Sequence, residues 1–110
     1  MKIREAQNKI KHILKGMEHP RLGSFIALTE EVGEVANEIM KKEIYASKNR
    51  DEDLKSEIAD VFVCLLELSN VYGIDLEKEF QKKLENITPR AEEWKVKFGK
   101  ALKEKRKKLD

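Results

Sequence analysis

The sequence predicts an all-α protein: an antiparallel helical bundle of four to five helices, completed by oligomerisation. Apolar residues recur every three or four positions through most of the chain, which is the spacing of a buried helix face. Charged residues make up 40% of the 110 residues and aromatic residues only 6%, a balance typical of helical bundles. The segment 61–66 is apolar on every side, which is more than one small bundle covers. We therefore expect a homodimer or homotetramer, with the region 61–68 buried at or near the interface.

The first two helices follow from their apolar spacing and their end signals. The first is expected over 2–17. Gly16 and the pair His19-Pro20 should end it, because proline disfavours helix in the residue that precedes it. The second is expected to begin at 22–25 and to end at 42–45. Ser24 is a candidate N-cap for that helix, since a serine oxygen can accept from the first free backbone N–H groups.

The third helix, expected over 51–71, is the most apolar of the chain. A fourth is expected over 76–87, capped by Asp75. Thr88 followed by Pro89 is typical of a cap and a first helical position, so the sequence predicts a fifth helix that begins at Pro89.

Two acidic pairs mark the second and third helices: Glu31 with Glu34, and Glu57 with Asp60. Each pair is spaced i, i+3, so its members lie on one helix face, one turn apart. By helical-wheel geometry, both pairs lie about 90–100° from the apolar seam of their helix, in the same rotational sense. The short connection at 46–53 predicts antiparallel neighbours, and the shared offset then brings all four carboxylates to one side of the helix pair.

Four carboxylates gathered at one place repel each other and raise each other's pKa unless a cation lies among them. Oxygen ligands of this kind suit Mg²⁺, with Mn²⁺ as the alternative. We therefore predict a metal site made of both acidic pairs. The competing interpretation is a solvated acidic face, because glutamate is common on exposed helices.

Three segments carry a family resemblance: EEVGEVA at 30–36, EIADV at 57–61 and YGIDLE at 72–77. Together they resemble the MazG-like nucleoside triphosphate pyrophosphohydrolases, an all-α superfamily that includes dimeric dUTPases and phosphoribosyl-ATP pyrophosphatases. The resemblance covers about 22–90 and rests on the order and spacing of ExxE, a spacer and ExxD. It implies a single MazG-like domain over 1–110, with a basic C-terminal tail from about 103.

The resemblance also implies an activity. It is Mg²⁺-dependent cleavage of (deoxy)nucleoside triphosphates between the α and β phosphates, giving monophosphate and pyrophosphate, as in house-cleaning of the nucleotide pool. Ala91 stands where the family often has another basic or aromatic residue, and no aromatic base-stacking residue is located, so the base preference stays open. The residues that match the family's site are Glu31, Glu34, Glu57 and Asp60 as metal ligands, Glu30 or Glu38 as general base, and Lys83, Asn86 and Arg90 as substrate-binding residues.

Other features narrow the class of protein. No apolar run approaches membrane-spanning length and the start carries no apolar leader, so we expect a cytoplasmic protein without a membrane partner. The net charge of +2 does not favour nucleic acid as a partner. Cys64 is the only cysteine, which excludes an internal disulfide and favours a small buried side chain. His19 is expected on the surface of a loop, with contact to a substrate as the alternative.

Three other functions remain open at this point. The closest is a phosphoribosyl-ATP pyrophosphatase-like enzyme. The second is a non-catalytic helical interaction module, which would not bind Mg²⁺ in the low millimolar range. The third is a nucleic-acid-binding protein that uses the basic tail, whose binding would weaken steeply with salt.

Overall fold

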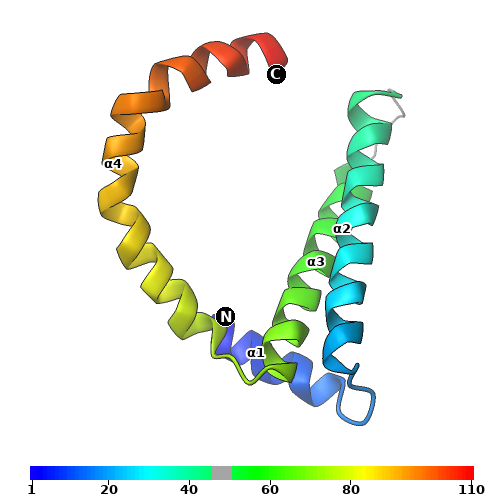
Figure 1. The fold of residues 1–110 in the computed structure, drawn as a ribbon. Coiled ribbons are helices and arrows are strands. Elements are labelled where there is room, and N and C mark those ends of the chain that lie inside the picture. The colour runs from blue at the N-terminus through cyan, green and yellow to red at the C-terminus, as the bar shows by residue number, and fades with distance from the viewer. Residues whose placement is uncertain (46–50) are drawn as a thin grey trace. The chain divides into compact units, whose positions relative to one another are not determined.

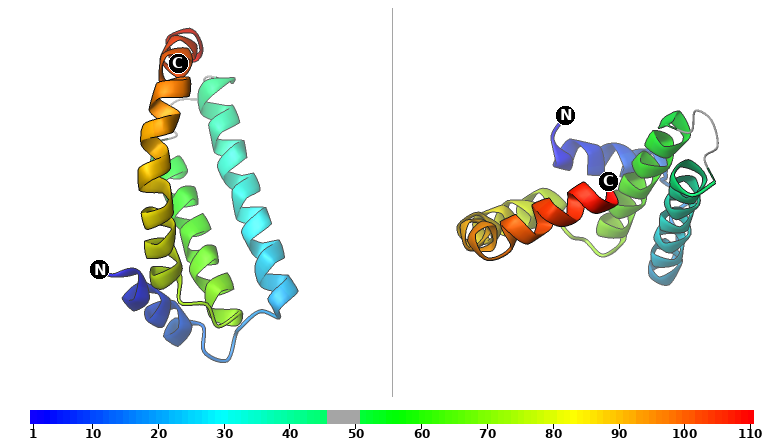
Figure 2. Two further views of the ribbon diagram at one scale, coloured as in Figure 1. Left: turned by 60° about the vertical axis from the view of Figure 1, so that its left-hand side comes forward. Right: turned by 90° about the horizontal axis from the view of Figure 1, so that it is seen from above.

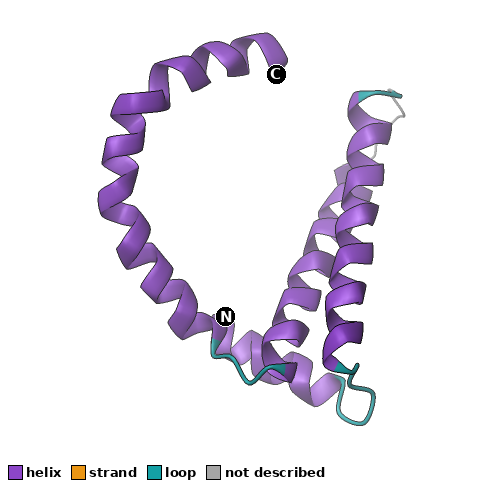
Figure 3. Ribbon diagram, viewed as in Figure 1, coloured by secondary structure: helices purple, strands orange, loops and turns teal. Residues whose placement is uncertain are grey.

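The structure, a computed structural model of the 110-residue chain, describes residues 1–45 and 51–110. Within them it has four α-helices and no strand, which confirms the all-α prediction (Figure 1, Figure 3). The chain divides into two compact units, Met1–Leu76 and Glu77–Asp110, which are described separately below. The helices are α1 (Ile3–Ile13), α2 (Arg21–Glu43), α3 (Asp51–Val71) and α4 (Leu76–Leu109).

Helices α2 and α3 lie side by side and antiparallel, as the views in Figure 1 and Figure 2 agree. Ser24, in the first turn of α2, donates a hydrogen bond to Glu67, near the end of α3. Two turns further along α2, Glu31 meets Asp60. The antiparallel packing expected from the short connection is therefore found, although 46–50, in the middle of that connection, lie outside the described residues.

Helix α1 packs against α3 and is shorter than the expected 2–17. The helix stops at Ile13, and Gly16 then takes a positive φ of 86°, a backbone conformation that glycine adopts without strain. Leu14 and Met17 fit the apolar stripe, so the spacing extends the predicted helix to 17. The turn at Gly16, one of the predicted end signals, comes earlier, and the helix ends at Ile13.

The prediction that Ser24 is an N-cap is wrong, because α2 begins earlier, at Arg21 directly after Pro20. Proline has a φ that suits a helix start, and it lacks the N–H that would need a partner there. Ser24 therefore lies inside the first turn, where it is 1% exposed. Its hydroxyl is directed across to α3 instead of to the backbone of its own helix.

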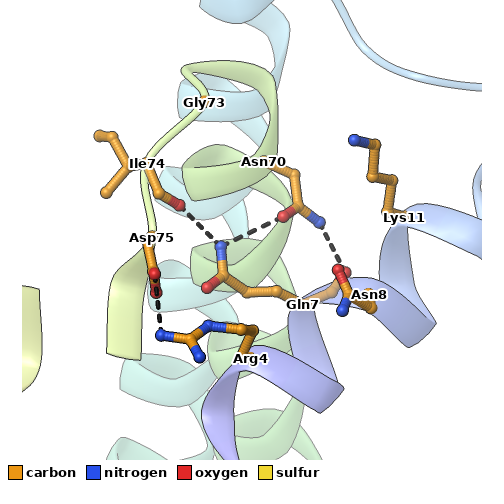
Figure 4. Close-up of a pocket in the computed structure, with 8 residues that line it drawn as sticks. All are labelled: Arg4, Gln7, Asn8, Lys11, Asn70, Gly73, Ile74 and Asp75. Atoms are coloured by element: carbon orange, nitrogen blue, oxygen red, sulfur yellow. Dashed lines mark hydrogen bonds and ion pairs between the residues drawn. The ribbon is translucent and has the colours of Figure 1, made fainter. Parts of the chain in front are cut away.

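A buried glutamine joins α1 to the end of α3 (Figure 4). The Nε2 of Gln7 donates to the Asn70 side chain at 3.2 Å and to the Ile74 carbonyl at 2.8 Å. Its Oε1 accepts from the Leu76 N–H at 2.9 Å, while Asn70 donates back to the Gln7 carbonyl at 2.9 Å. Gln7 is only 5% exposed, so these bonds fix the turn between α3 and α4 onto α1.

The apolar core of the first unit is small. Leu66 on α3, at 2% exposure, is the only hydrophobic residue of the described chain that is fully buried. Large apolar side chains of α2 and α3 stay about half exposed, among them Phe25, Val32 and Ile58. These helices therefore present apolar surface that a further partner could cover.

The predicted fourth and fifth helices are one continuous helix, so the prediction of a new start at Pro89 is wrong. The Thr88 hydroxyl donates back to the Leu84 carbonyl at 2.7 Å, as it does inside a helix, and makes no N-terminal cap. Proline inside a helix removes one N–H donor and crowds the preceding turn, which bends the helix without ending it here. Figure 1 shows α4 curving along its length. No side chain of α4 is buried.

Candidate metal centre

Three acidic side chains from two helices meet on the first unit. Glu31 comes from α2, and Glu57 and Asp60 come one turn apart from α3. One carboxylate oxygen from each lies within 4.8 Å of those of the other two. Glu31 and Glu57 are half-buried and Asp60 is exposed, so the group is open to solvent on one side. Its spacing and donor type fit a hard divalent cation such as Mg²⁺.

The electrostatics of the group point the same way. The pKa of Glu57 is raised, first by partial removal from water and then by the negative charges of Asp60 and Glu31, with Glu34 and Glu38 adding to the effect. Each carboxylate thus makes it harder for Glu57 to hold its charge. A divalent cation bound among them would remove that repulsion, so the residues present fit the metal that the sequence pattern predicts.

The other predicted carboxylates lie around this triad. Glu34 is exposed and lies outside the three-residue group, although it is close enough to act on the pKa of Glu57. Glu38 is buried one turn further on, with its Oε1 at 3.5 Å from the Lys41 ammonium group. Glu30 is exposed on the neighbouring face of α2. The structure therefore brings together three of the four predicted ligands and sets Glu34 at their edge.

The comparison with protein families agrees with this geometry. Residues 24–95 match the MazG nucleotide pyrophosphohydrolase domain. This chain belongs to that family. The comparison with curated proteins gave no match, and neither did the comparison with solved structures. The matched range of the MazG domain contains the acidic triad and continues into the second unit.

The three predicted substrate-binding residues of the MazG domain lie on α4, in the second unit. Lys83, Asn86 and Arg90 are spaced i, i+3, i+7, so they share one face of that helix. Arg90 donates to the Asn86 side-chain oxygen at 3.2 Å, and its guanidinium lies over the Trp94 ring, 5.0 Å from the ring centre. A guanidinium fixed by both contacts is oriented to hold an anion on its remaining N–H groups.

Sequence reasoning missed a second polar cluster on the first unit. Glu67, 7% exposed, accepts hydrogen bonds at its Oε1 from His19 Nδ1 at 2.5 Å and from the Ser24 hydroxyl at 3.3 Å. Its signal was present in the spacing, because Glu67 follows Asp60 by seven residues and so lies on nearly the same face of α3.

Cys64 lies between the triad and this second cluster. Burial raises the pKa of its thiol, and the negative charges of Glu31, Glu67 and Asp60 add to that shift. A thiol held in its neutral form is a poor nucleophile. Cys64 was expected to be buried, and the structure shows it only half-buried. Among the described residues, none of the helices combines the length and the apolar character that crossing a membrane requires.

Proposed function

We propose that this MazG domain hydrolyses nucleoside triphosphates between the α and β phosphates, releasing a nucleoside monophosphate and pyrophosphate with the help of Mg²⁺. The observation that carries the proposal is the triad of Glu31, Glu57 and Asp60, whose ligand atoms lie within 4.8 Å of one another inside the matched domain. A polyphosphate substrate brings negative charge to a site that is itself negative. Such a pairing is favourable only when divalent cations lie between the two.

In this proposal Glu31, Glu34, Glu57 and Asp60 hold the metal. A divalent ion held there would neutralise charge on the phosphates and make the α phosphorus easier to attack. The half-buried position of Glu31 and Glu57 limits how much water competes for that ion. Glu34 lies at the exposed edge of the triad and would bind the ion from the solvent side.

The attacking water needs a base that accepts its proton, and two carboxylates flank the ligands. Glu38 is buried and acts on the pKa of Glu57, which places it close to the triad. Glu30 is exposed and directly precedes a ligand in the chain. We propose that one of the two is the general base. Replacing Glu30 and Glu38 with glutamine, one at a time, separates them. Only the variant that lacks the true base should show a lower kcat with unchanged Mg²⁺ binding.

Lys83, Asn86 and Arg90 would hold the phosphate chain. Lysine offers a compact positive charge and arginine a planar fork, and both recognise phosphate oxygens. The contacts of Arg90 with Asn86 and with Trp94 support this role, because they limit the conformations of the guanidinium before a ligand arrives.

We also propose that one MazG domain forms from the whole chain and that it works as a homodimer or homotetramer. The support is the small core around Leu66 together with an uncovered groove of 250 Å³ on the α2–α3 pair. A second copy of the chain would bury this surface. Light scattering that gives 12.8 kDa, the mass of one chain, at micromolar concentration would refute it. The apolar residues that line the groove are Val32, Val35, Ile58 and Val61.

One panel of assays tests the activity. Canonical and modified nucleoside triphosphates are incubated with the protein and Mg²⁺, and pyrophosphate release is followed. The proposal expects release from at least one triphosphate and none when the metal is chelated. If no triphosphate yields pyrophosphate while the protein is folded, the domain would be a non-catalytic helical module.

A further inference from the structure

We propose that Glu67 recognises the base of the substrate, and that the site selects nucleobases carrying an exocyclic amino group. The base would enter the cavity between α1 and α3. The inference rests on the proposed function, because it takes the acidic triad as the place where the phosphates bind. It assigns a role to a buried carboxylate that metal binding does not require.

The position of Glu67 relative to the triad supports this assignment. Asp60 and Glu67 are seven residues apart on α3, which is two helical turns and about 10 Å along the axis. Seven residues also bring the side chains back to within about 20° of one another around the helix. In a nucleotide whose phosphates lie at the triad, the base lies about 10 Å away, which is the distance from Asp60 to Glu67 along the helix. On α2, Ser24 and Glu31 are also seven residues apart. Ser24 contacts Glu67 and Glu31 lies beside Asp60, so both helices line the stretch between the triad and Glu67.

A cavity lies at the end of this path. It has a volume of 110 Å³, and Glu67 is part of its wall. Cavities of about 150 Å³ take a benzene-sized ring, so this smaller, partly open cavity takes at most one six-membered ring, and the five-membered ring of a purine would lie outside it. Its residues come from α1, from the turn after α1 and from the end of α3. They are Ile10, Lys11, Leu14, Glu18, Glu67, Asn70 and Val71.

The chemistry of the wall decides which base fits. Ile10, Leu14 and Val71 offer apolar contact for the faces of a ring. The amide of Asn70 is already bonded to Gln7 through both its oxygen and its nitrogen. Glu18 is exposed, so the buried Glu67 is the carboxylate placed to meet a group that enters.

An ionised carboxylate only accepts hydrogen bonds. It therefore favours the amino group of cytosine, adenine or guanine. It disfavours the carbonyl that uracil and thymine present at the position where cytosine has its amino group. When uracil or thymine binds, its carbonyl would face the carboxylate of Glu67 without a hydrogen-bond donor between them. Burying two acceptors against each other is costly, so this discrimination is strong.

The hydrogen bonds to His19 and Ser24 hold Glu67 in place for this role. Both donors meet Oε1, so one carboxylate oxygen is fixed by the protein while the side chain still reaches the cavity wall. The arrangement is not a Ser-His-acid catalytic triad, because the serine and the histidine both bond to the carboxylate and not to each other. The cluster thus orients Glu67 and offers no activated nucleophile.

The test compares CTP with UTP, whose bases have the same ring size. They differ at C4, which carries an amino group in cytosine and a carbonyl in uracil, and at N3, which is an acceptor in cytosine and an N–H donor in uracil. With Mg²⁺, we expect the wild-type protein to give a kcat/KM at least about tenfold higher for CTP. Glu67→Gln supplies both a donor and an acceptor, so the ratio should fall toward one, mainly through loss on CTP. Glu5→Gln, an exposed charge change on α1 away from the cavity, should keep the wild-type ratio.

Other results would overturn the inference. One is a wild-type protein that treats CTP and UTP alike, and another is a Glu67→Gln variant that loses both activities equally, as a merely structural carboxylate would. If Glu67→Gln does not fold, Leu14→Phe fills the cavity from its wall and should lower the CTP preference; an unchanged preference would again contradict the inference. If no triphosphate is hydrolysed at all, the proposed function itself fails, and that result is distinct from hydrolysis without base selection.

Discussion

Replacing Asp60 with asparagine tests the acidic triad because the change keeps the shape of the side chain and removes one negative charge. The Asp60 ligand atom lies within 4.8 Å of those of Glu31 and Glu57, so a bound cation would lose one of three close charged ligands. Residues that only orient metal ligands already contribute about 10- to 100-fold to affinity or activity. We therefore expect Asp60→Asn to lower pyrophosphate release at least about 100-fold.

The metal-free protein should respond in the opposite direction. Among the charged groups, Asp60 contributes most to the raised pKa of Glu57, so removing its charge relieves repulsion in the folded state. The metal-free variant should unfold at the same temperature as the metal-free wild type, or at a higher one. Mg²⁺ at about ten times its Kd should stabilise the wild type by about 1.4 kcal/mol. For a domain of this size that is a rise in Tm of about 6 °C, most of which the variant should lose.

The assay is differential scanning fluorimetry with and without Mg²⁺, run beside the pyrophosphate assay. Glu34→Ala should lose activity and the Mg²⁺ effect in the same way. Glu79→Ala is the control, because Glu79 lies on α4 and pairs with Lys82 at 3.5 Å, outside the triad. Full activity and a full Mg²⁺ shift in Asp60→Asn and Glu34→Ala would show that the acids are a solvated face.

Three further predictions follow from single residues. The raised pKa of Glu57 means that the folded metal-free protein binds that proton more tightly than the unfolded chain, so its stability should fall as pH rises from about 4.5 through the folded pKa. Calorimetry should show this fall in the wild type and a flatter profile in Glu57→Gln; equal profiles would contradict it. Gln7→Ala leaves the partners of a buried side chain unpaired and should lower the free energy of unfolding in urea by about 3 kcal/mol, while exposed Asn8→Ala should stay within about 0.5 kcal/mol. Arg90→Ala should raise KM for a triphosphate about tenfold with a smaller change in kcat, and an unchanged KM would reduce Arg90 to an ordinary exposed residue.

Periodicity predicted the helices well, and it predicted their ends less well. The short connection predicted that α2 and α3 are antiparallel, and the phase of the apolar seams then placed Glu31 beside Asp60. The end of α1 and the continuity of α4 depend on local backbone geometry. Gly16 adopts a left-handed turn before the apolar stripe runs out, and Pro89 is accommodated within a helix that continues past it.

The polar clusters show a second limit of the sequence. Glu67 and Gln7 are buried through partners 48 and 63 residues away along the chain, His19 and Asn70. No spacing within one helix reveals such partners, so the burial of these two residues could not be predicted, although the spacing does place Glu67 on nearly the same face of α3 as Asp60. The acidic pairs could be recognised in the sequence, because two carboxylates one turn apart on one helix already supply half of the predicted metal ligands.

The most direct test of the central claim is product analysis with a triphosphate that the protein accepts. Phosphorus NMR of the reaction, with Mg²⁺ and with the metal chelated, identifies which bond is broken. The account predicts nucleoside monophosphate and pyrophosphate in equal amounts, formed only with the metal and abolished by Asp60→Asn. Nucleoside diphosphate with inorganic phosphate, or the same products without metal, would contradict it.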